Sequence, residues 1–374
     1  PGVRFHNGEP LMTNHVVDTL LALEPLNMFS HIKDVSSPAN CVVDVFLTRP
    51  DKYFPLALTE SVAKVTLPMI LRGEDYDIRP IGTGPYRIEK NDEKQLVLTA
   101  FNGYFGFRPL IDRVEVWVVD EAYSSMVYPS LSKPLMADRG DSDEVGLDPG
   151  CTYLLLNRKK GIAKDPKWAE FLSNALNAAD LFLHIPKETV IDMGVLHAYG
   201  IKPGWYDIKL KVPVCPPADT KPSIKLAYQC QHPMFPTLAK AIVTVLKEYN
   251  VDVDLFGYET DPPHADAVDI WINPMGIANN RDDALACWIM DYSFLDESSP
   301  GEDFDQWCHM IDRWRSGEFE QFPARQLGKQ LVQSNQLIPM FHCWLGVNKD
   351  HSGALQNAKC NALGWFDFSN VWVK

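Results

Sequence analysis

Residues 224–273 change their hydrophobic period in a way that is typical of an α/β unit. The runs IKLAY (Ile224 to Tyr228) and DIWIN (Asp269 to Asn273) are short and mostly apolar, as buried strands are. Between them, PTLAKAIVTVLKEY (236–249) has apolar residues at helical spacing, and VDVDLFGYE (251–259) is again strand-like. A strand, a helix and a strand of these lengths predict parallel pairing through a right-handed crossover.

Three more segments of the second half show the amphipathic period of helices. In the segment 165–181, Asp165 is a typical N-cap, Pro166 fits the first turn, and the apolar residues fall on one face. We also expect helices over residues 303–317 and from Pro323 onward, because both segments carry one apolar stripe.

The first 120 residues are expected to contain fewer helices. Thr13 is the expected N-cap of a helix that continues to about Glu24. The runs YRIEK (86–90) and KQLVLTAF (94–101) are joined by NDE and predict a β-hairpin, and RVEVWVVD (113–120) alternates as a further strand.

Residues 129–150 are polar, acidic and rich in Ser, Asp, Gly and Pro, so we expect a crossover or linker with a lobe boundary close by. After this segment, CTYLLLN (151–157) is expected to be a buried strand. The aromatic tail QLIPMFHCWLGVNKD (336–350) is also strand-like. The chain of 374 residues is too long for one simple core, so two or three lobes are expected.

Charge and composition narrow the function classes. The chain is 46% hydrophobic and 22% charged, as in an ordinary soluble protein, and no apolar run is long enough to span a membrane. The net charge is −14, from 35 basic and 49 acidic residues, and it would repel a phosphate backbone. We therefore do not expect this part of the protein to bind DNA or RNA, nor a membrane.

Cysteines and the start of the chain bear on the compartment. The 8 cysteines are scattered without any C-x-x-C pair, which favours a reducing compartment and hence the cytoplasm, although one or two disulfides stay open. The opening residues PGVRFHNGEP contain no initiator Met, no charged region and no apolar core. We therefore expect a fragment whose upstream part carries any targeting signal or further domain.

Local motifs do not point to an enzyme. In PIGTGPY (80–86), Pro85 removes a backbone donor and a strand follows, so a structural turn is favoured over a phosphate-binding loop. The adjacent pairs Cys308–His309 and His342–Cys343 point to different faces and do not chelate a metal. No G-x-S-x-G elbow or cysteine-protease signature occurs. We expect no catalytic residue, no metal and no cofactor.

Several segments, in order, resemble the family 5 extracellular solute-binding proteins of the peptide- and nickel-binding type. They are PGVRFHNGEPLMTNHVVDTL (1–20), PIGTGPYRIEK (80–90) and FNGYFGFRPLIDRVEVWVVD (101–120). The resemblance implies an α/β, two-lobed periplasmic-binding-protein-like fold (class II, family 5 type) that is N-terminally truncated. It also implies these boundaries: part of a lobe I subdomain over 1–79, lobe I over 80–150, lobe II (α/β) over 151–335, and a return to lobe I over 336–374.

A narrower resemblance is to the C-terminal half of SgrR-type transcriptional regulators. It is carried by CTYLLLN (151–157), IPMFHCWL (338–345) and above all NALGWFDFSNVW (361–372). Members of that family join a winged-helix DNA-binding domain to a solute-binding domain in the cytoplasm and respond to sugar-phosphate stress. The resemblance implies that DNA is contacted only through a domain that this chain lacks.

The chain departs from the transport members of the family at two places. The helix over 165–181 reads FLSNALNAADL where transporters carry a charged pattern, and PMGIANNRDD (274–283) stands in place of their acidic peptide-anchoring motif. A peptide ligand and a transporter partner are therefore disfavoured. We expect a ligand-sensing domain that closes on a small polar metabolite such as a sugar phosphate, by a population shift between open and closed states.

The expected ligand contacts lie on the strands and loops of lobe II and on the returning strand. Arg281 would supply paired donors to a phosphate. An aromatic residue of this set is as easily explained by the core, and a surface charge is the simpler explanation for Arg281. The predicted ligand-binding residues are Tyr153, Asn157, Trp271, Asn273, Arg281, His342 and Trp344.

Two alternatives stay open at this stage. A periplasmic solute-binding protein of an ABC importer would carry a signal peptide upstream, whereas a regulator would carry a helix-turn-helix. An uncharacterised hydrolase would need a reactive nucleophile, for which the sequence gives no anchor.

Overall fold

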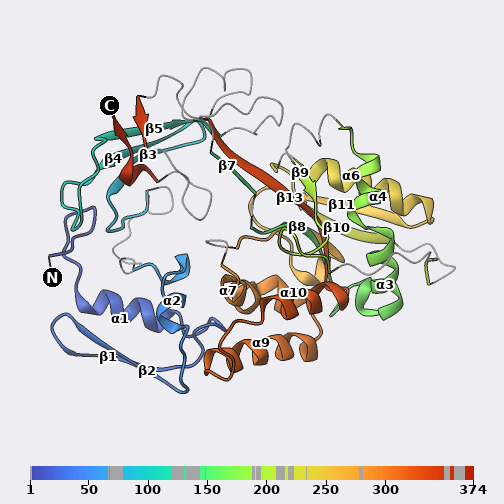
Figure 1. Ribbon diagram of the computed structural model, residues 1–374, viewed down its shortest axis with the longest axis horizontal. Helices are drawn as coiled ribbons and strands as arrows, with labels where there is room; N and C mark the ends of the chain where they lie inside the picture. The colour runs from blue at the N-terminus through green and yellow to red at the C-terminus, as the bar shows by residue number, and fades with distance from the viewer. Residues whose placement is uncertain are drawn as a thin grey trace.

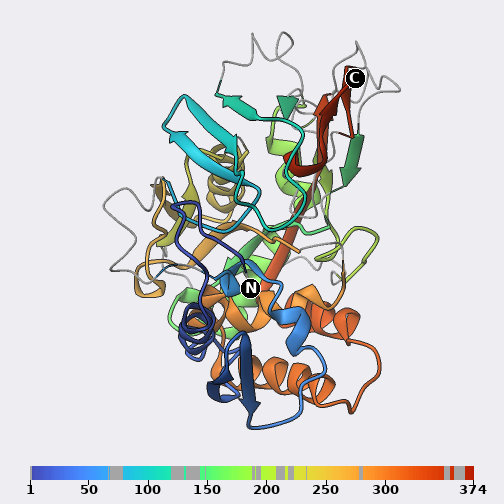
Figure 2. The same cartoon turned by 90° about the vertical axis from the view of Figure 1, so that its left-hand side faces the viewer.

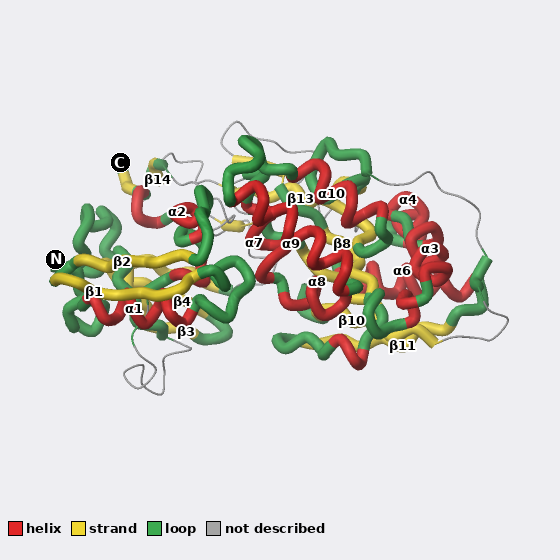
Figure 3. Tube along the Cα trace, turned by 90° about the horizontal axis from the view of Figure 1, so that it is seen from below, coloured by secondary structure: helices red, strands yellow, loops and turns green. Residues whose placement is uncertain are grey.

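The computed structural model describes residues 2–65, 67, 79–118, 130–131, 144–147, 149–187, 190, 195–207, 215–217, 223–232, 234–277, 281–348, 354–357 and 367–374. Figure 1 shows a helix-covered sheet at one end and the N-terminal elements with a smaller sheet at the other. Both termini lie at the end with the smaller sheet, as Figure 3 also shows.

A mixed sheet forms the centre of the larger end. Its strand order is β11-β10-β12-β8-β13-β6, with β10 parallel to both β11 and β12, and β8 antiparallel to both β12 and β13. The crossover helix α6 (Phe235–Glu248) joins β10 to β11, which confirms the predicted parallel unit. The other elements of this part are β8 (Thr152–Leu156), β10 (Ser223–Gln229), β11 (Asp252–Tyr258) and β12 (Ile270–Pro274).

Helices cover both faces of this sheet, because its central strands carry apolar residues on both sides. On one face, Leu154 and Ile272 pack against α3 (Pro166–Ala175), α4 (Ala178–Leu181) and α6. On the other face, Leu155 and Trp271 pack against a second set of helices. That set is α7 (Ala284–Asp291), α8 (Ser293–Ser298), α9 (Gly301–Arg315) and α10 (Ala324–Gln333).

The N-terminal elements share a core with α7 and α9. Phe29 and Phe54 belong to the same buried cluster as Leu285, Ile311 and Trp314, although they are far apart in sequence. Figure 2 shows the N-terminal elements in blue beside the orange helices. These elements are α1 (Thr13–Ala22), the antiparallel pair β1 (Ile32–Ala39) and β2 (Val42–Leu47), and the single turn α2 (Phe54–Ala57).

The smaller sheet has the order β3-β4-β5, with β3 (Tyr86–Asn91), β4 (Gln95–Ala100) and β5 (Arg113–Trp117), and it confirms the predicted hairpin and strand. The glycine turn before β3 contacts the turn at residues 5–8. The main-chain N–H of His6 donates to the carbonyl of Gly82 at 2.9 Å, and Nε2 of His6 lies 3.1 Å from the carbonyl of Gly84. The turn therefore holds two distant segments together.

The strand β13 (Leu337–Asn348) connects the two ends of the molecule (Figure 1). Its first half pairs with β8 and with β9 (Val195–His197), and its second half pairs with β7 (Glu144–Leu147) and β6 (Ser130–Leu131). The pairing with β8 is irregular between Pro339 and Phe341. A short pair, β14 (Leu355–Gln356) with β15 (Trp372–Val373), lies near the C-terminus.

Two expectations about local structure were wrong. The N-cap of α1 is Met12 and not Thr13, because Nδ1 of His15 accepts the N–H of Met12 at 3.1 Å and does the capping from inside the helix. Within residues 129–150 the structure places β6 and β7 against β13, so this segment is not simply a linker. Its polar composition is compatible with strands here, since edge strands tolerate polar side chains.

Candidate functional site

The strand register brings three of the predicted site residues to one face of the larger sheet. Tyr153 on β8 is the direct partner of Asn273 on β12. Trp271 lies two residues before Asn273 and so points to the same face. Tyr153 and Trp271 are completely buried, and Asn273 is 6% exposed.

Aromatic side chains from α7 and α8 cover this face. The ring of Trp288 lies 5.7 Å from Tyr153 in an edge-to-face arrangement and stacks on Tyr292 at 5.3 Å. Phe294 contacts Trp271 at 5.7 Å and Tyr292 at 5.6 Å. The sequence analysis did not select Trp288 or Tyr292, although the helical spacing of the run ALACWIMDYSFL (284–295) could have indicated them.

The polar atoms of this aromatic cluster are donors. Burial, with a smaller contribution from the neighbouring Tyr292, raises the pKa of Tyr153 well above its usual value. Burial likewise raises the pKa of Tyr292 to about 12, against the opposing effect of Tyr153 and Asn273. Both phenols therefore stay protonated at neutral pH. Nε1 of Trp271 is buried and has no hydrogen-bond partner in the described part of the chain.

The arrangement suits binding better than catalysis. Protonated phenols and an indole N–H can donate hydrogen bonds to a ligand, and the rings offer apolar contact. Among the residues that the structure describes, no three His, Cys, Asp or Glu side chains are placed to hold a metal ion. Because the cluster is packed shut, a ligand would reach it only after α7 and α8 had shifted.

Asn157, also predicted as a ligand contact, binds main-chain groups. Its Nδ2 donates to the carbonyls of Ala265 at 2.7 Å and Val268 at 2.9 Å, and its Oδ1 accepts from the N–H of Lys160 at 2.9 Å. The side chain is completely buried and joins the end of β8 to the loop before β12. A direct ligand contact by Asn157 stays a prediction.

Arg281 is partly exposed just before α7 and pairs with Asp283. Nε of Arg281 donates to Oδ1 of Asp283 at 2.9 Å, and Nη2 donates to the other carboxylate oxygen. This hydrogen bonding raises the pKa of Arg281. A phosphate would have to compete with Asp283 for the guanidinium, so the role of Arg281 also stays a prediction.

His342 and Trp344 lie on β13, past its irregular pairing. Nδ1 of His342 is 2.6 Å from the carbonyl of Gly150, and the ring is buried. Trp344 pairs through its main chain with Leu147, while its side chain lies outside the described part. The structure therefore does not bring these two residues to the cluster around Trp271, and their binding role stays a prediction.

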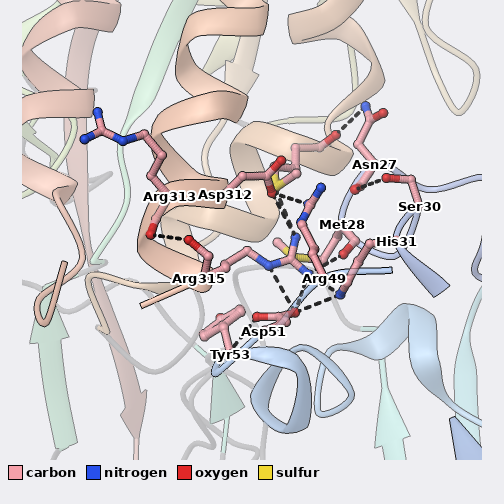
Figure 4. Close-up of polar contacts among 12 residues, drawn as sticks. Asn27, Met28, Ser30, His31, Arg49, Asp51, Tyr53, Asp312, Arg313 and Arg315 are labelled. Atoms are coloured by element: carbon pink, nitrogen blue, oxygen red, sulfur yellow. Dashed lines mark hydrogen bonds and ion pairs between the residues drawn. The ribbon is translucent and has the colours of Figure 1, made fainter. Parts of the chain in front are cut away.

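A buried ionic junction ties the N-terminal elements to α9, close to this site (Figure 4). Nη2 of Arg315 donates to Oδ2 of Asp51 at 2.6 Å and to the carbonyl of Met28 at 2.6 Å. Nε2 of His31 lies 3.1 Å from the same Oδ2. Although burial opposes it, hydrogen bonds from His31 and Arg315 hold the pKa of Asp51 far below its usual range.

The sequence analysis missed this junction because no local pattern announces it. Asp51 follows β2 in a turn, and Arg315 is the last residue of a helix whose other charged residues face solvent. The junction fixes the N-terminal elements on α9, whose Trp307 belongs to the same core as Trp271. It therefore couples the position of these elements to the helices near the aromatic cluster.

Comparison with known sequences identifies relatives of this chain. A family model described as "Bacterial extracellular solute-binding proteins, family 5 Middle" matches residues 1–181. The HTH-type transcriptional regulator SgrR of Yersinia enterocolitica is 30% identical over 382 residues, which cover 100% of this chain and 66% of that protein. SgrR of Escherichia coli O6:K15:H31 is 29% identical over 381 residues, which cover 100% of this chain and 65% of that protein. The chain thus spans slightly less than two thirds of these regulators.

Comparison with solved structures identifies the fold. The murein tripeptide binding protein MppA of Escherichia coli matches with a TM-score of 0.75 and 14% identity, covering 100% of this chain and 85% of that one. The oligopeptide-binding protein AppA of Bacillus subtilis, in complex with a nonapeptide, matches with a TM-score of 0.73 and 17% identity, covering 100% and 86%. NikA of Staphylococcus aureus, in complex with Ni(L-His)2, has a TM-score of 0.71 and 12% identity, covering 100% and 86%.

These findings confirm the predicted fold class and the predicted family. The described residues contain no helix that is long and apolar enough to cross a membrane. The structural neighbours fix the two-lobed α/β fold of the family 5 type, at identities too low to carry more than the fold. The chain belongs to the family 5 bacterial extracellular solute-binding proteins, and over its whole length it is similar to the SgrR-type transcriptional regulators.

Proposed function

We propose that this chain is the ligand-sensing, solute-binding part of a bacterial transcription regulator. The observation that carries the proposal is the similarity over 100% of the chain to HTH-type regulators, at 30% identity for the Yersinia enterocolitica protein. The net charge of −14 is consistent with DNA contact through another part of such a regulator. The chain binds a ligand and carries out no chemistry on it.

The proposed ligand is a small polar metabolite, such as a sugar phosphate. The sensing region consists of the aromatic cluster around Trp271, together with Arg281 and the strand that carries His342 and Trp344. The domain boundaries given by the sequence analysis (1–79, 80–150, 151–335 and 336–374) remain part of this proposal. Ligand binding shifts the population from an open to a closed state, which requires a higher affinity for the closed state.

The proposed compartment is the cytoplasm. The described cysteines, Cys41, Cys151, Cys215, Cys230, Cys287, Cys308 and Cys343, are all free thiols. Unpaired cysteines in this number are more common in a reducing compartment.

Titration with glucose 6-phosphate, followed by tryptophan fluorescence and by the melting temperature, tests the proposal. We expect a saturable response, which Arg281→Ala weakens at least tenfold because the phosphate loses its bidentate partner. Arg313→Ala is the matched control, because Arg313 is an exposed arginine that pairs with Glu318 on the same side of the sequence. A flat response of the wild-type protein to a panel of sugar phosphates would contradict ligand sensing.

A second candidate is a solute-binding protein that serves an importer. It is favoured by the structural neighbours, whose ligands include a nonapeptide and Ni(L-His)2. A tri- to nonapeptide panel and Ni(L-His)2 in the same titration separate the two: saturable binding of either, with no response to sugar phosphates, would favour this candidate.

A further inference from the structure

A cavity of about 320 Å³ lies at the edge of the larger sheet, on the outer side of β13. It is formed where α3 and α4 meet the end of α10 and the start of β13. In the sheet order β8 lies between β12, which carries Trp271, and β13. The cavity is therefore separate from the region proposed above to bind the sensed ligand.

The walls of this cavity combine apolar and polar groups. Its apolar wall consists of Ala178, Ala198, Val332, Leu337, Ile338 and Pro339. Its polar wall consists of Ser173, Asn174, Asn177, Asp180, Tyr199 and Asn335. A few convergent polar groups on an apolar cavity of this size are typical of small-molecule sites, at the small end of their range.

The polar wall is held in place by its own hydrogen bonds. Nδ2 of Asn177 donates to Oδ2 of Asp180 at 3.1 Å and to the carbonyl of Asn174 at 3.2 Å. Oδ1 of Asn177 accepts the N–H of Asp180 at 3.1 Å. These bonds orient the carboxylate before any ligand arrives, which reduces the entropy lost on binding.

Two observations indicate what the cavity takes. Asp180 is the only charged side chain among its described lining residues, so the potential there is negative and an anion is disfavoured. Oγ of Ser173 is buried and has no hydrogen-bond partner in the described part of the chain. A buried hydroxyl without a partner costs free energy that a ligand could recover by hydrogen bonding to it.

We propose that this cavity is a second small-molecule site, which binds a molecule rich in hydrogen-bond donors and without negative charge. The carboxylate of Asp180 and the amide oxygens accept from hydroxyl or ammonium groups of the ligand, and the wall around Leu337 contacts its carbon skeleton. A sugar without phosphate and a short diamine share this chemistry. The site thus differs in charge preference from the sugar-phosphate site of the proposed function.

Isothermal titration with glucose and with 1,4-diaminobutane tests the proposal, with glucose 6-phosphate as the anionic comparison. We expect the wild-type protein to bind at least one of the first two with a dissociation constant in the millimolar range or below. Binding of glucose alone identifies a hydroxyl-rich ligand, and binding of the diamine alone identifies an ammonium ligand. Absence of binding for both at about 10 mM would overturn the proposal.

Substitutions locate the binding. Ser173→Leu fills the cavity and is expected to weaken binding at least tenfold. Thr244→Trp, an exposed position on α6, is the control and leaves binding unchanged. If Ser173→Leu does not fold, Ala179→Trp at an exposed lining position takes its place. Wild-type affinity in the cavity-filling variant would also overturn the proposal.

The two proposals can fail separately. Trp271→Phe alters the aromatic cluster and leaves the cavity intact, so it should not change the binding of glucose or the diamine. Ser173→Leu should in turn leave the response to glucose 6-phosphate unchanged. A probe that responds only to the first substitution belongs to the aromatic cluster, and that result contradicts the cavity as its site.

Discussion

Nη2 of Arg315 lies 2.6 Å from Oδ2 of Asp51, and both side chains are completely buried. The two residues are 264 positions apart, so one ion pair joins the N-terminal elements to the end of α9. His31 shares the same carboxylate oxygen. A buried pair of this kind is costly to break by removing one partner, because the other charge is left without compensation.

Arg315→Met should therefore lower the free energy of unfolding by about 3–5 kcal/mol. Urea denaturation followed by circular dichroism measures the change. Arg313→Met is the control, since its pair with Glu318 is exposed and should matter by less than about 1 kcal/mol. The double variant Arg315→Met with Asp51→Leu should recover part of the loss. Equal effects of Arg315→Met and Arg313→Met would contradict the role of the junction.

Asp291 predicts a decrease in stability as the pH rises. Burial raises its pKa to about 6, so the folded protein binds more protons than the unfolded chain between the usual value and about 6. The contribution of Asp291 is therefore most favourable at low pH and is lost as the pH rises through about 6. The loss amounts to about 2 kcal/mol.

Asp291→Asn tests this slope, because an asparagine oxygen can still accept the N–H of Met28, which now donates to Oδ1 of Asp291 at 2.9 Å. We expect the variant to gain stability relative to the wild type from pH 4 to pH 7, as measured by thermal unfolding across this range. Parallel pH profiles of the two proteins would show that Asp291 is not perturbed.

His232 predicts a slope of the opposite sign. Burial lowers its pKa to about 4, and its ring stacks on Phe235 at 3.6 Å. The folded protein then binds fewer protons than the unfolded chain between about 4 and 6.5, so stability is lost as the pH falls through this range. After allowance for partial exposure, the effect is about 2 kcal/mol.

His232→Asn should remove this acid sensitivity, because its side-chain oxygen can replace Nδ1 as the acceptor of the N–H of Met234. His264→Asn is the control, since His264 is exposed. Thermal unfolding at pH 4.5 and 7 gives the comparison. An unchanged loss of stability in His232→Asn at the lower pH would refute the prediction.

Asn157→Ala separates a structural role from a binding role. Loss of the side chain leaves the carbonyls of Ala265 and Val268 without their buried donor, which should cost about 2–4 kcal/mol. Asn7→Ala, at an exposed position, should cost less than about 1 kcal/mol and serves as the control in urea denaturation. A variant of wild-type stability that no longer responds to ligand would instead assign Asn157 to binding.

Strong periodicity made the α/β part predictable. The strands β10, β11 and β12 and the crossover helix α6 were predicted from short apolar runs and one helical stripe, and Asp165 caps α3 as expected, accepting the N–H of Lys167 at 2.9 Å. These features depend on neighbours in sequence. Thr13 failed as a cap because a histidine inside the helix took that role, a competition that propensities do not rank.

Long-range contacts set the limit for the candidate site. The sequence predicted the strands of Tyr153 and Trp271, but their common face follows from an antiparallel register between β8 and β12 that no local pattern fixes. The Arg315–Asp51 junction and the cover by Trp288 likewise depend on tertiary packing. The sequence therefore identified aromatic strands, while the structure determined which side chains meet.

The continuity of β13 has a mechanical consequence. One strand carries Leu337 beside β8 and Trp344 beside β7, so the two sheet regions share a single stretch of backbone. A rotation of one region against the other must then be absorbed by φ and ψ changes within that strand, and the irregular pairing between Pro339 and Phe341 is where the fewest ladder hydrogen bonds oppose it. The molecule would thus flex like a bent spring and not swing on a loose linker.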